Sequence, residues 1–331
     1  MAFDVSRPDI STAQLTSTSR AERITVRFVE NRAEWDALVA SAPEPHLPQA
    51  FAYAAGKSAT GWPARHVVFL SAGRPVAFTV VLQMKRFGLP LLNRVNRGPI
   101  FLGANPPDEQ VVAVYKALRN RFGRLWTLPL LIAPAMHQSD RSDRLMRQAG
   151  YRLRAPSCWS SGRIDLTMDE DQLWASFSST FRNRARAAEK AGAELRIAED
   201  AETYEWMIAR HLENMEEKEF SAASPTMLRT LRETSPGDVI VFQLVSEGKP
   251  LAGMSLVRFG NVAEYHIGWF GAEGRKFNAG NFLMWNVMRE LKRRGVKSFD
   301  VGGLRNGDGY ARFKRTMNPV EYKLASEWMS F

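Results

Sequence analysis

The chain has 331 residues, 45% of them hydrophobic, so it can bury a sizeable core, and its length favours two domains over one. A formal net charge of +10 suits acidic partners: nucleic acid, phosphorylated cofactors, nucleotide-linked sugars or an anionic membrane face. The single cysteine, Cys158, excludes an internal disulfide, and no apolar run reaches the roughly 20 residues that span a bilayer.

The N-terminus is expected to lie outside the fold. Residues 1–20 are polar and contain no secretory hydrophobic region, so we predict a disordered segment there. The same absence favours a cytoplasmic protein with no stable membrane insertion.

Short helices and strands alternate through the first half of the chain. A strand is predicted over 24–29, followed by a helix that ends at a group of prolines and a second helix over 51–58. A helix over 108–121 then precedes an apolar strand over 125–132. Between these helices, turn residues separate strands expected at 66–70, 75–84 and 93–98.

The middle of the chain carries a basic helix. It is expected over 178–192, after a strand at 159–166 and an acidic helix start at 169–173. Arg182 and Arg186 are four residues apart and share one face, where guanidinium groups could bind a phosphate or carboxylate of a substrate. The alternative is a solvated face on which Arg186 pairs with Glu189. A strand at 194–197 and a helix over 201–220 follow.

A strand, a glycine-containing loop, a helix and a second strand follow one another near the C-terminus. The strands are predicted at 263–269 and 298–303, and the helix over 281–294. Such a unit gathers backbone N–H groups at a positive helix end, which suits phosphate or pyrophosphate. The alternative is an ordinary loop before a helix. The expected cofactor-binding residues are Arg275, Asn278, Gly280 and Asn281.

The order of elements repeats along the chain. Ser71–Ala77 resembles Ser246–Ala252, 175 residues later, and Arg86–Gly88 matches Arg258–Gly260 at a distance of 172. The helices that start at residues 108 and 281 are 173 apart. Three matches at nearly one offset indicate two copies of one α/β module, over 21–157 and 158–331.

Three motifs in the second copy resemble one enzyme family. They are the Arg-rich helix ending at Gly192, the strand Phe299-Asp300-x-Gly-Gly303 and the segment Gly309-Tyr310-x-x-Phe313-Lys314. Together they resemble the FemAB-like branch of the GNAT acyltransferase superfamily, from about Thr25 to the C-terminus. The resemblance implies an α/β (α+β) fold of two tandem GNAT-like modules, each a mixed, mostly antiparallel sheet flanked by helices. It also implies an N-acyltransferase that acts on an amine.

The resemblance leaves the acyl donor open. Acyl-CoA is usual in the superfamily, whereas FemAB proteins take aminoacyl groups from tRNA. The GNAT loop pattern Gln/Arg-x-x-Gly-x-Gly/Ala is kept at Arg275 and Gly280 but has Asn278 at its first glycine, and asparagine tolerates positive φ. The first copy has Leu102-Gly-Ala-Asn-Pro-Pro107 in place of this loop, so one donor site is expected, in the second copy. The pair Phe313-Lys314 also lacks the aromatic residue and glycine that commonly follow it in FemAB-like proteins.

Five polar residues are candidates for the chemistry. Glu264 and His266 share one strand face, where a base could take the proton of the amine, and Asp300 is the rival base. Lys314 could meet donor phosphates or the developing oxyanion. Tyr310 could protonate the leaving group or cap a loop. The family resemblance also allows a mechanism without a dedicated base.

The sequence is therefore compatible with three functions. The first is an N-acyltransferase that uses acyl-CoA. The second is an aminoacyl-tRNA-dependent transferase that acts on a cell-envelope peptide precursor, and the third is a module that binds RNA or an anionic surface without catalysis. No metal is expected, because the five histidines are scattered. The acceptor would be a small-molecule or peptide amine and the protein a monomer, because the second copy covers what single GNAT domains often cover by dimerising.

Overall fold

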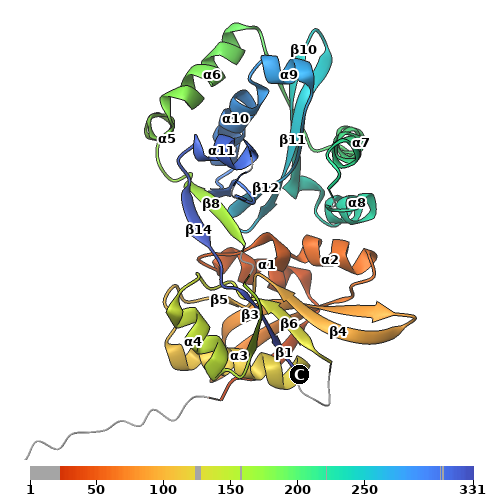
Figure 1. Ribbon diagram of the computed structural model, residues 1–331, viewed down its shortest axis with the longest axis vertical. Helices are drawn as coiled ribbons and strands as arrows, with labels where there is room; N and C mark the ends of the chain where they lie inside the picture. Colours follow the sequence, from red (N-terminus) through yellow and green to blue (C-terminus); the bar gives the residue numbers. More distant parts are fainter. Residues whose placement is uncertain (1–22, 124–127, 157–158, 221, 306, 308) are drawn as a thin grey trace, which may run out of the picture.

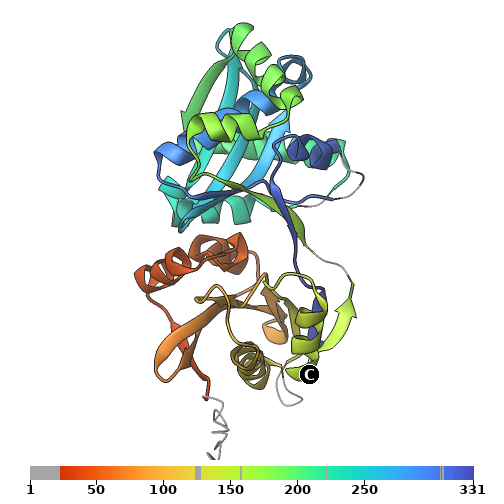
Figure 2. The same ribbon diagram turned by 90° about the vertical axis from the view of Figure 1, so that its left-hand side faces the viewer.

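Two α/β modules stack along the long axis of the molecule (Figures 1 and 2). No helix in the described part of the chain is long and apolar enough to cross a membrane. The structure is a computed structural model that describes residues 23–123, 128–156, 159–220, 222–305, 307 and 309–331. The N-terminal segment predicted to be disordered, residues 1–20, lies outside these ranges, as does Cys158.

The first module is built on a sheet of strand order β1-β2-β3-β4-β6-β15-β7, with the short β5 paired to β3. Helices α3 and α4 pack on one face of the sheet, and α1 and α2 pack on the other. Its elements are β1 (Thr25–Val29), α1 (Arg32–Ser41), α2 (Phe51–Ala59), β2 (Ala64–Ser71), β3 (Arg74–Arg86), β4 (Leu89–Asn96), β5 (Ile100–Phe101), α3 (Asp108–Phe122), β6 (Leu130–Ala133), α4 (Asp140–Gln148), β7 (Arg152–Ala155) and β15 (Glu327–Ser330).

The second module has a sheet of order β14-β8-β13-β12-β11-β10-β9. Helices α6 and α10 pack on one face, while α7 and α8 cover the other, and α8 packs against α2 of the first module. Its elements are β8 (Ser160–Asp165), α5 (Glu170–Ser176), α6 (Ser179–Lys190), β9 (Glu194–Ala198), α7 (Ala201–Glu217), α8 (Pro225–Thr234), β10 (Val239–Ser246), β11 (Lys249–Phe259), β12 (Val262–Phe270), α9 (Ala272–Lys276), α10 (Ala279–Arg293), β13 (Ser298–Asp300), α11 (Gly309–Arg315) and β14 (Val320–Lys323).

The two modules share one topology, which confirms the predicted tandem fold. Each sheet contains one parallel pair, β4 with β6 and β12 with β13, and the other pairs among the described strands are antiparallel. The repeated sequences form equivalent turns, because Ser71 pairs with Arg74 at the β2–β3 turn as Ser246 pairs with Lys249 at the β10–β11 turn.

In each sheet, one strand inserts between two strands that are not its neighbours in sequence. Strand β8 follows β7 but lies between β13 and β14, and β15 ends the chain but lies between β6 and β7 (Figure 2). Strands β1–β7 thus belong to the first sheet and β8–β14 to the second, while β15 returns to the first. Fully buried Trp328 anchors β15, and Glu327 forms ion pairs with Arg94 and Arg154.

A shared hydrophobic cluster joins the modules. Trp35 and Phe78 of the first module belong to the same cluster as Tyr204 and Leu228 of α7 and α8, and all four are at most 1% exposed. Burial of large apolar side chains from both modules stabilises the contact between them. The cavity described next lies at the edge of this contact.

Candidate active site

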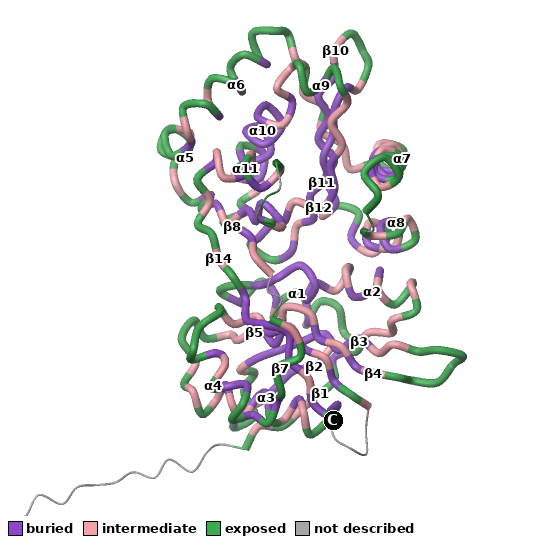
Figure 3. The backbone as a smooth tube through the Cα atoms, in the orientation of Figure 1, coloured by how far each residue is buried: buried purple, intermediate pink, exposed green. Residues whose placement is uncertain are grey.

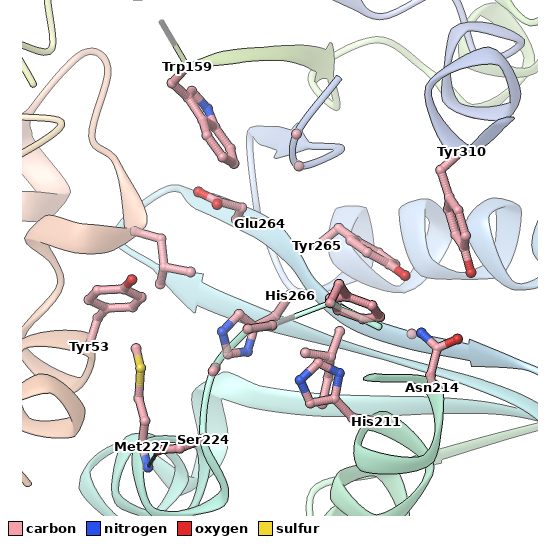
Figure 4. A pocket seen from close by; sticks show the side chains of 18 of the residues that line it. Tyr53, Trp159, His211, Asn214, Ser224, Met227, Glu264, Tyr265, His266 and Tyr310 are labelled. Carbon is pink, nitrogen blue, oxygen red and sulfur yellow. Dashed lines mark hydrogen bonds between the residues drawn. The ribbon is translucent and has the colours of Figure 1, made fainter. Parts of the chain in front are cut away.

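A cavity of about 860 Å³ lies where the modules meet (Figure 4). Helix α2, Leu47, Trp62 and Arg97 contribute the wall from the first module. Trp159, strand β12, helices α7, α8 and α11 and the loops next to them contribute the rest. The polar and aromatic lining residues are Tyr53, Lys57, Thr60, Trp62, Arg97, Trp159, His211, Asn214, Lys218, Phe220, Ser224, Glu264, Tyr265, His266, Arg305, Tyr310 and Lys314.

The cavity begins where the parallel strands β12 and β13 separate. They pair only through Val262–Glu264 and Ser298–Asp300, while β12 continues to Phe270. The chain turns away at Gly302, which has a φ of 72°, and a Cβ there would lie 3.1 Å from the carbonyl oxygen of Tyr265. Residues 264–268 therefore border the cavity on one side of the split, and Gly302 and Gly303 on the other.

Asp300 holds this turn. Its carboxylate accepts hydrogen bonds from the backbone N–H of Gly302 at 2.9 Å, the hydroxyl of Tyr322 at 2.6 Å and the hydroxyl of Ser161. The side chain is 2% exposed and does not line the cavity. This placement favours a structural role over the predicted role of Asp300 as a base.

Glu264 forms a buried ion pair with Arg97 across the module junction. Its carboxylate accepts hydrogen bonds from both terminal nitrogens of Arg97 at 3.1–3.2 Å, and the two side chains are only 6% and 11% exposed. The guanidinium also lies 4.4 Å from the ring centroid of Trp159. Burial raises the pKa of Glu264, and the charge of Arg97 opposes that rise. Glu264 thus lines the cavity as an ion-paired carboxylate, which weakens its candidacy as the base.

Two histidines face the cavity (Figure 4). His266 comes from β12 and His211 from α7, and neither Nδ1 of His266 nor Nε2 of His211 has a hydrogen-bond partner among the described residues. Burial lowers the pKa of His266 to about 4 and also lowers the pKa of His211. Both rings are therefore neutral near pH 7. Sequence reasoning missed His211, although it lies on the buried face of α7 with Met207 and Ile208, at helical spacing.

Helix α11 brings Tyr310 and Lys314 to the same cavity. Lys314 is 5% exposed, and its ammonium donates a hydrogen bond to the carbonyl of Gly303 at 3.2 Å. The ammonium also lies 4.8 Å from the ring centroid of Tyr265. The structure thus gathers Glu264, His266, Tyr310 and Lys314 around one space.

The charge of the cavity wall is positive. Lys57, Lys218, Arg305 and Lys314 line it, and the one acidic lining residue in the described chain is Glu264, which is neutralised by Arg97. These positively charged side chains come from both modules. An anionic substrate would therefore be attracted to the junction.

The loop predicted to bind the donor has the expected backbone at its centre. Asn278 is left-handed, with φ 54° and ψ 36°, and its side chain leaves the start of α10 uncapped. The residues before it form the short helix α9, because Gly274 lets this segment pack against β11: a Cβ there would lie 2.5 Å from the carbonyl oxygen of Leu251. Arg275 is exposed, and a Cβ on Gly280 would meet the Phe313 ring at 3.1 Å. None of the four predicted donor residues, Asn281 included, lines the cavity.

Arg182 and Arg186 lie on α6, outside the cavity. Arg182 donates a hydrogen bond to the carbonyl of Ala175 at 2.7 Å, and the guanidinium of Arg186 lies 5.2 Å from the ring centroid of Trp174. Their predicted role in substrate binding thus gains no support from position. Within the described ranges, no group of three His, Cys, Asp or Glu side chains could hold a metal ion.

Comparisons with known proteins support the tandem fold. A family model described as an acetyltransferase (GNAT) domain matches residues 175–315, whereas no curated protein sequence matches. Among solved structures, FemX is 17% identical, with 92% of this chain and 96% of that chain covered and a TM-score of 0.78.

Two further structures share the fold. The C-terminal domain of a putative lysylphosphatidylglycerol synthetase from Agrobacterium fabrum is 15% identical, covers 90% of this chain and 91% of its own, and has a TM-score of 0.53. A tandem GNAT protein from the clavulanic acid biosynthesis pathway is 13% identical, with coverage of 93% and 98% and a TM-score of 0.50. The chain thus shares its fold with FemX and with a tandem GNAT protein, and the GNAT domain match lies in the second module.

Proposed function

We propose that this protein is an N-acyltransferase that transfers an acyl group from acyl-CoA to an amine within the cavity between the modules. The observation that carries this proposal is the split between β12 and β13. Among the described strands, none pairs with β12 on that side from Tyr265 onward, and this open edge lies at the cavity. An acyl-pantetheine arm is an extended chain with amide groups, and such a chain can pair with an open strand edge.

In this proposal the amine nitrogen attacks the thioester carbonyl, the C–N bond forms, and the C–S bond then breaks to release the thiolate. The ammonium of Lys314 stabilises the oxyanion of the tetrahedral intermediate. Neutral His266 accepts the proton that the nitrogen loses, and Tyr310 supplies a proton to the departing thiolate. The cationic wall adds long-range attraction for the polyanionic donor, whose phosphates bind at the start of α10.

Donor binding tests the proposal directly. Calorimetry with CoA, acetyl-CoA and a long-chain acyl-CoA is expected to show micromolar affinity, since the start of α10 offers backbone N–H groups and Arg275 adds positive charge. Arg275→Ala should weaken binding by about fivefold to tenfold. Arg186→Ala, a charge loss of the same kind on α6, serves as the control and should leave the affinity unchanged. If none of the three ligands binds, the acyl-CoA proposal is wrong.

An aminoacyl-tRNA donor is the second candidate, and one observation favours it. The predicted donor loop does not line the cavity, whereas cations from both modules do, as a large polyanion would require. Transfer of the aminoacyl group from charged tRNA to an amine, without CoA binding, would establish this alternative. Strongly salt-dependent RNA binding without any acyl transfer would instead identify a non-catalytic binding module.

The pH dependence of the reaction tests the state of His266. Because burial lowers its pKa to about 4, the imidazole is neutral from about pH 5 upward. We therefore expect kcat/KM to show no acidic limb near the ordinary histidine pKa of about 6.5. A limb near that pH in the wild type that disappears in His266→Gln would contradict the buried, neutral ring. Measurements between about pH 5.5 and 8.5 cover this range.

A further inference from the structure

The hairpin between β3 and β4 projects beyond the rest of its sheet. Strand β2 pairs with β3 only as far as Leu82, and β6 pairs with β4 only from Asn93. The ribbon between these two residues therefore has no neighbouring strand in the described chain. Figure 1 shows it extending past α2 and α8, and Figure 3 shows its end as exposed.

Apolar side chains are concentrated at the tip of this ribbon. Phe87 is 91% exposed, Leu89 is 69% exposed and Leu91 is 42% exposed. Leu89 and Leu91 alternate with Pro90 and so share one face of the strand. Most other exposed large hydrophobic residues are single, whereas these three lie within five positions of each other. Such a contiguous apolar surface marks a site of interaction.

Phe87 occupies a position that disfavours it. The turn residues Phe87 and Gly88 have φ values of 52° and 79°, a conformation that suits glycine or asparagine and strains a bulky side chain. The ring packs into no core cluster and touches only the guanidinium of Arg86, 5.3 Å from its centroid, among the ring contacts of the described chain. The Phe87 ring thus joins no core cluster of the described chain and is open to an external surface.

The surroundings of the tip are basic. Lys85 and Arg86 are exposed, and neither forms an ion pair with an acid in the part of the chain that the structure describes. Over residues 45–107 the sequence contains no Asp or Glu. It contains seven Lys or Arg over the same range: Lys57, Arg65, Arg74, Lys85, Arg86, Arg94 and Arg97.

We propose that this hairpin tip docks the protein on the surface of an anionic lipid bilayer. Phe87, Leu89 and Leu91 enter the boundary between headgroups and acyl chains, while Lys85 and Arg86 contact lipid phosphates. An exposed apolar tip with flanking cations and no acids meets both requirements of peripheral membrane binding. This proposal does not depend on the acyl-transfer reaction. A protein groove would also accept the apolar tip, but it would not explain the acid-free surroundings.

Co-sedimentation with vesicles tests the proposal. The full chain should bind vesicles of phosphatidylcholine with about a quarter phosphatidylglycerol, and bind pure phosphatidylcholine vesicles at least tenfold more weakly. The double variant F87S/L89S should reduce partitioning by about tenfold or more, because it removes the inserting side chains. The matched control is Val320→Ser, which removes a 75% exposed apolar side chain on β14. This control should leave binding unchanged.

A fluorescence measurement reports on the tip itself. Phe87→Trp should show a blue-shifted emission increment when anionic vesicles are added, and Val320→Trp should show none. Undiminished binding of F87S/L89S would mean that net charge alone attracts the protein, and the proposal would be wrong. Absence of binding to anionic vesicles would also overturn it and would leave a protein partner as the occupant of the tip.

Discussion

Replacing Arg97 with alanine is expected to lower the free energy of unfolding by about 3–5 kcal/mol at neutral pH. The carboxylate of Glu264 is buried and accepts all three hydrogen bonds of the pair from Arg97. Loss of the guanidinium would leave a buried charge without its partner, and would also remove the stacking on Trp159. Denaturant unfolding followed by circular dichroism measures the change.

The pH dependence of this effect has a defined sign. Burial already raises the pKa of Glu264, and removal of Arg97 takes away the charge that opposes the rise. A carboxyl whose pKa is higher in the folded state than in the unfolded state is penalised as pH rises above the unfolded value of about 4.3. The difference in stability between wild type and Arg97→Ala should therefore grow from about pH 4.5 towards pH 7.5. A constant difference over this range would contradict the uncompensated charge.

Two variants separate the buried pair from ordinary surface charge. Arg229→Ala breaks an ion pair with Glu205 in which the side chains are 50% and 46% exposed, so it should cost less than about 1 kcal/mol. The double variant R97M/E264L removes both buried charges and should lose less stability than Arg97→Ala alone. An equal loss of unfolding free energy in Arg229→Ala and Arg97→Ala would show that the buried pair stabilises the protein no more than an exposed pair.

The sequence predicted the elements whose signals are local. The helix expected over 281–294 is α10, which begins two residues earlier, at Ala279. The repeated turns form as expected because glycines at positive φ, such as Gly73 and Gly248, close both hairpins. Asn278, in the loop predicted to bind the donor, adopts the left-handed backbone that its residue type permits. Periodicity and turn chemistry act over a few residues and are readable without tertiary structure.

The rest depends on contacts between distant segments. Glu264 was a candidate base from its strand alone, and only the fold shows that Arg97, 167 positions away, neutralises it. Asp300 has the residue type of a base, but hydrogen bonds from three other groups assign it to a turn. Helix α4 was not predicted, because Leu145 and Met146 are its only buried apolar residues. Likewise, no local sequence pattern predicts that β15, at the end of the chain, pairs with strands of the first sheet.

Substituting Lys314 with methionine is expected to lower kcat/KM for acyl transfer by about 100-fold. Methionine keeps much of the side-chain volume beside Tyr265 but removes the ammonium from the edge of the split. The readout is thiol release from acyl-CoA in the presence of an amine that supports turnover. Unchanged circular dichroism and thermal unfolding would exclude misfolding. Undiminished kcat/KM would show that Lys314 does not take part in the reaction.

The kinetic pattern distinguishes the two roles considered for Lys314. An oxyanion role acts only in the transition state, so kcat and kcat/KM should fall together, whereas a phosphate-binding role should chiefly raise KM for the donor. Lys314→Gln provides the structural control, because its amide can still donate to the carbonyl of Gly303, the 3.2 Å contact that ties α11 to the split. If glutamine restores activity, Lys314 only positions the loop; if glutamine is as impaired as methionine, the reaction requires the positive charge.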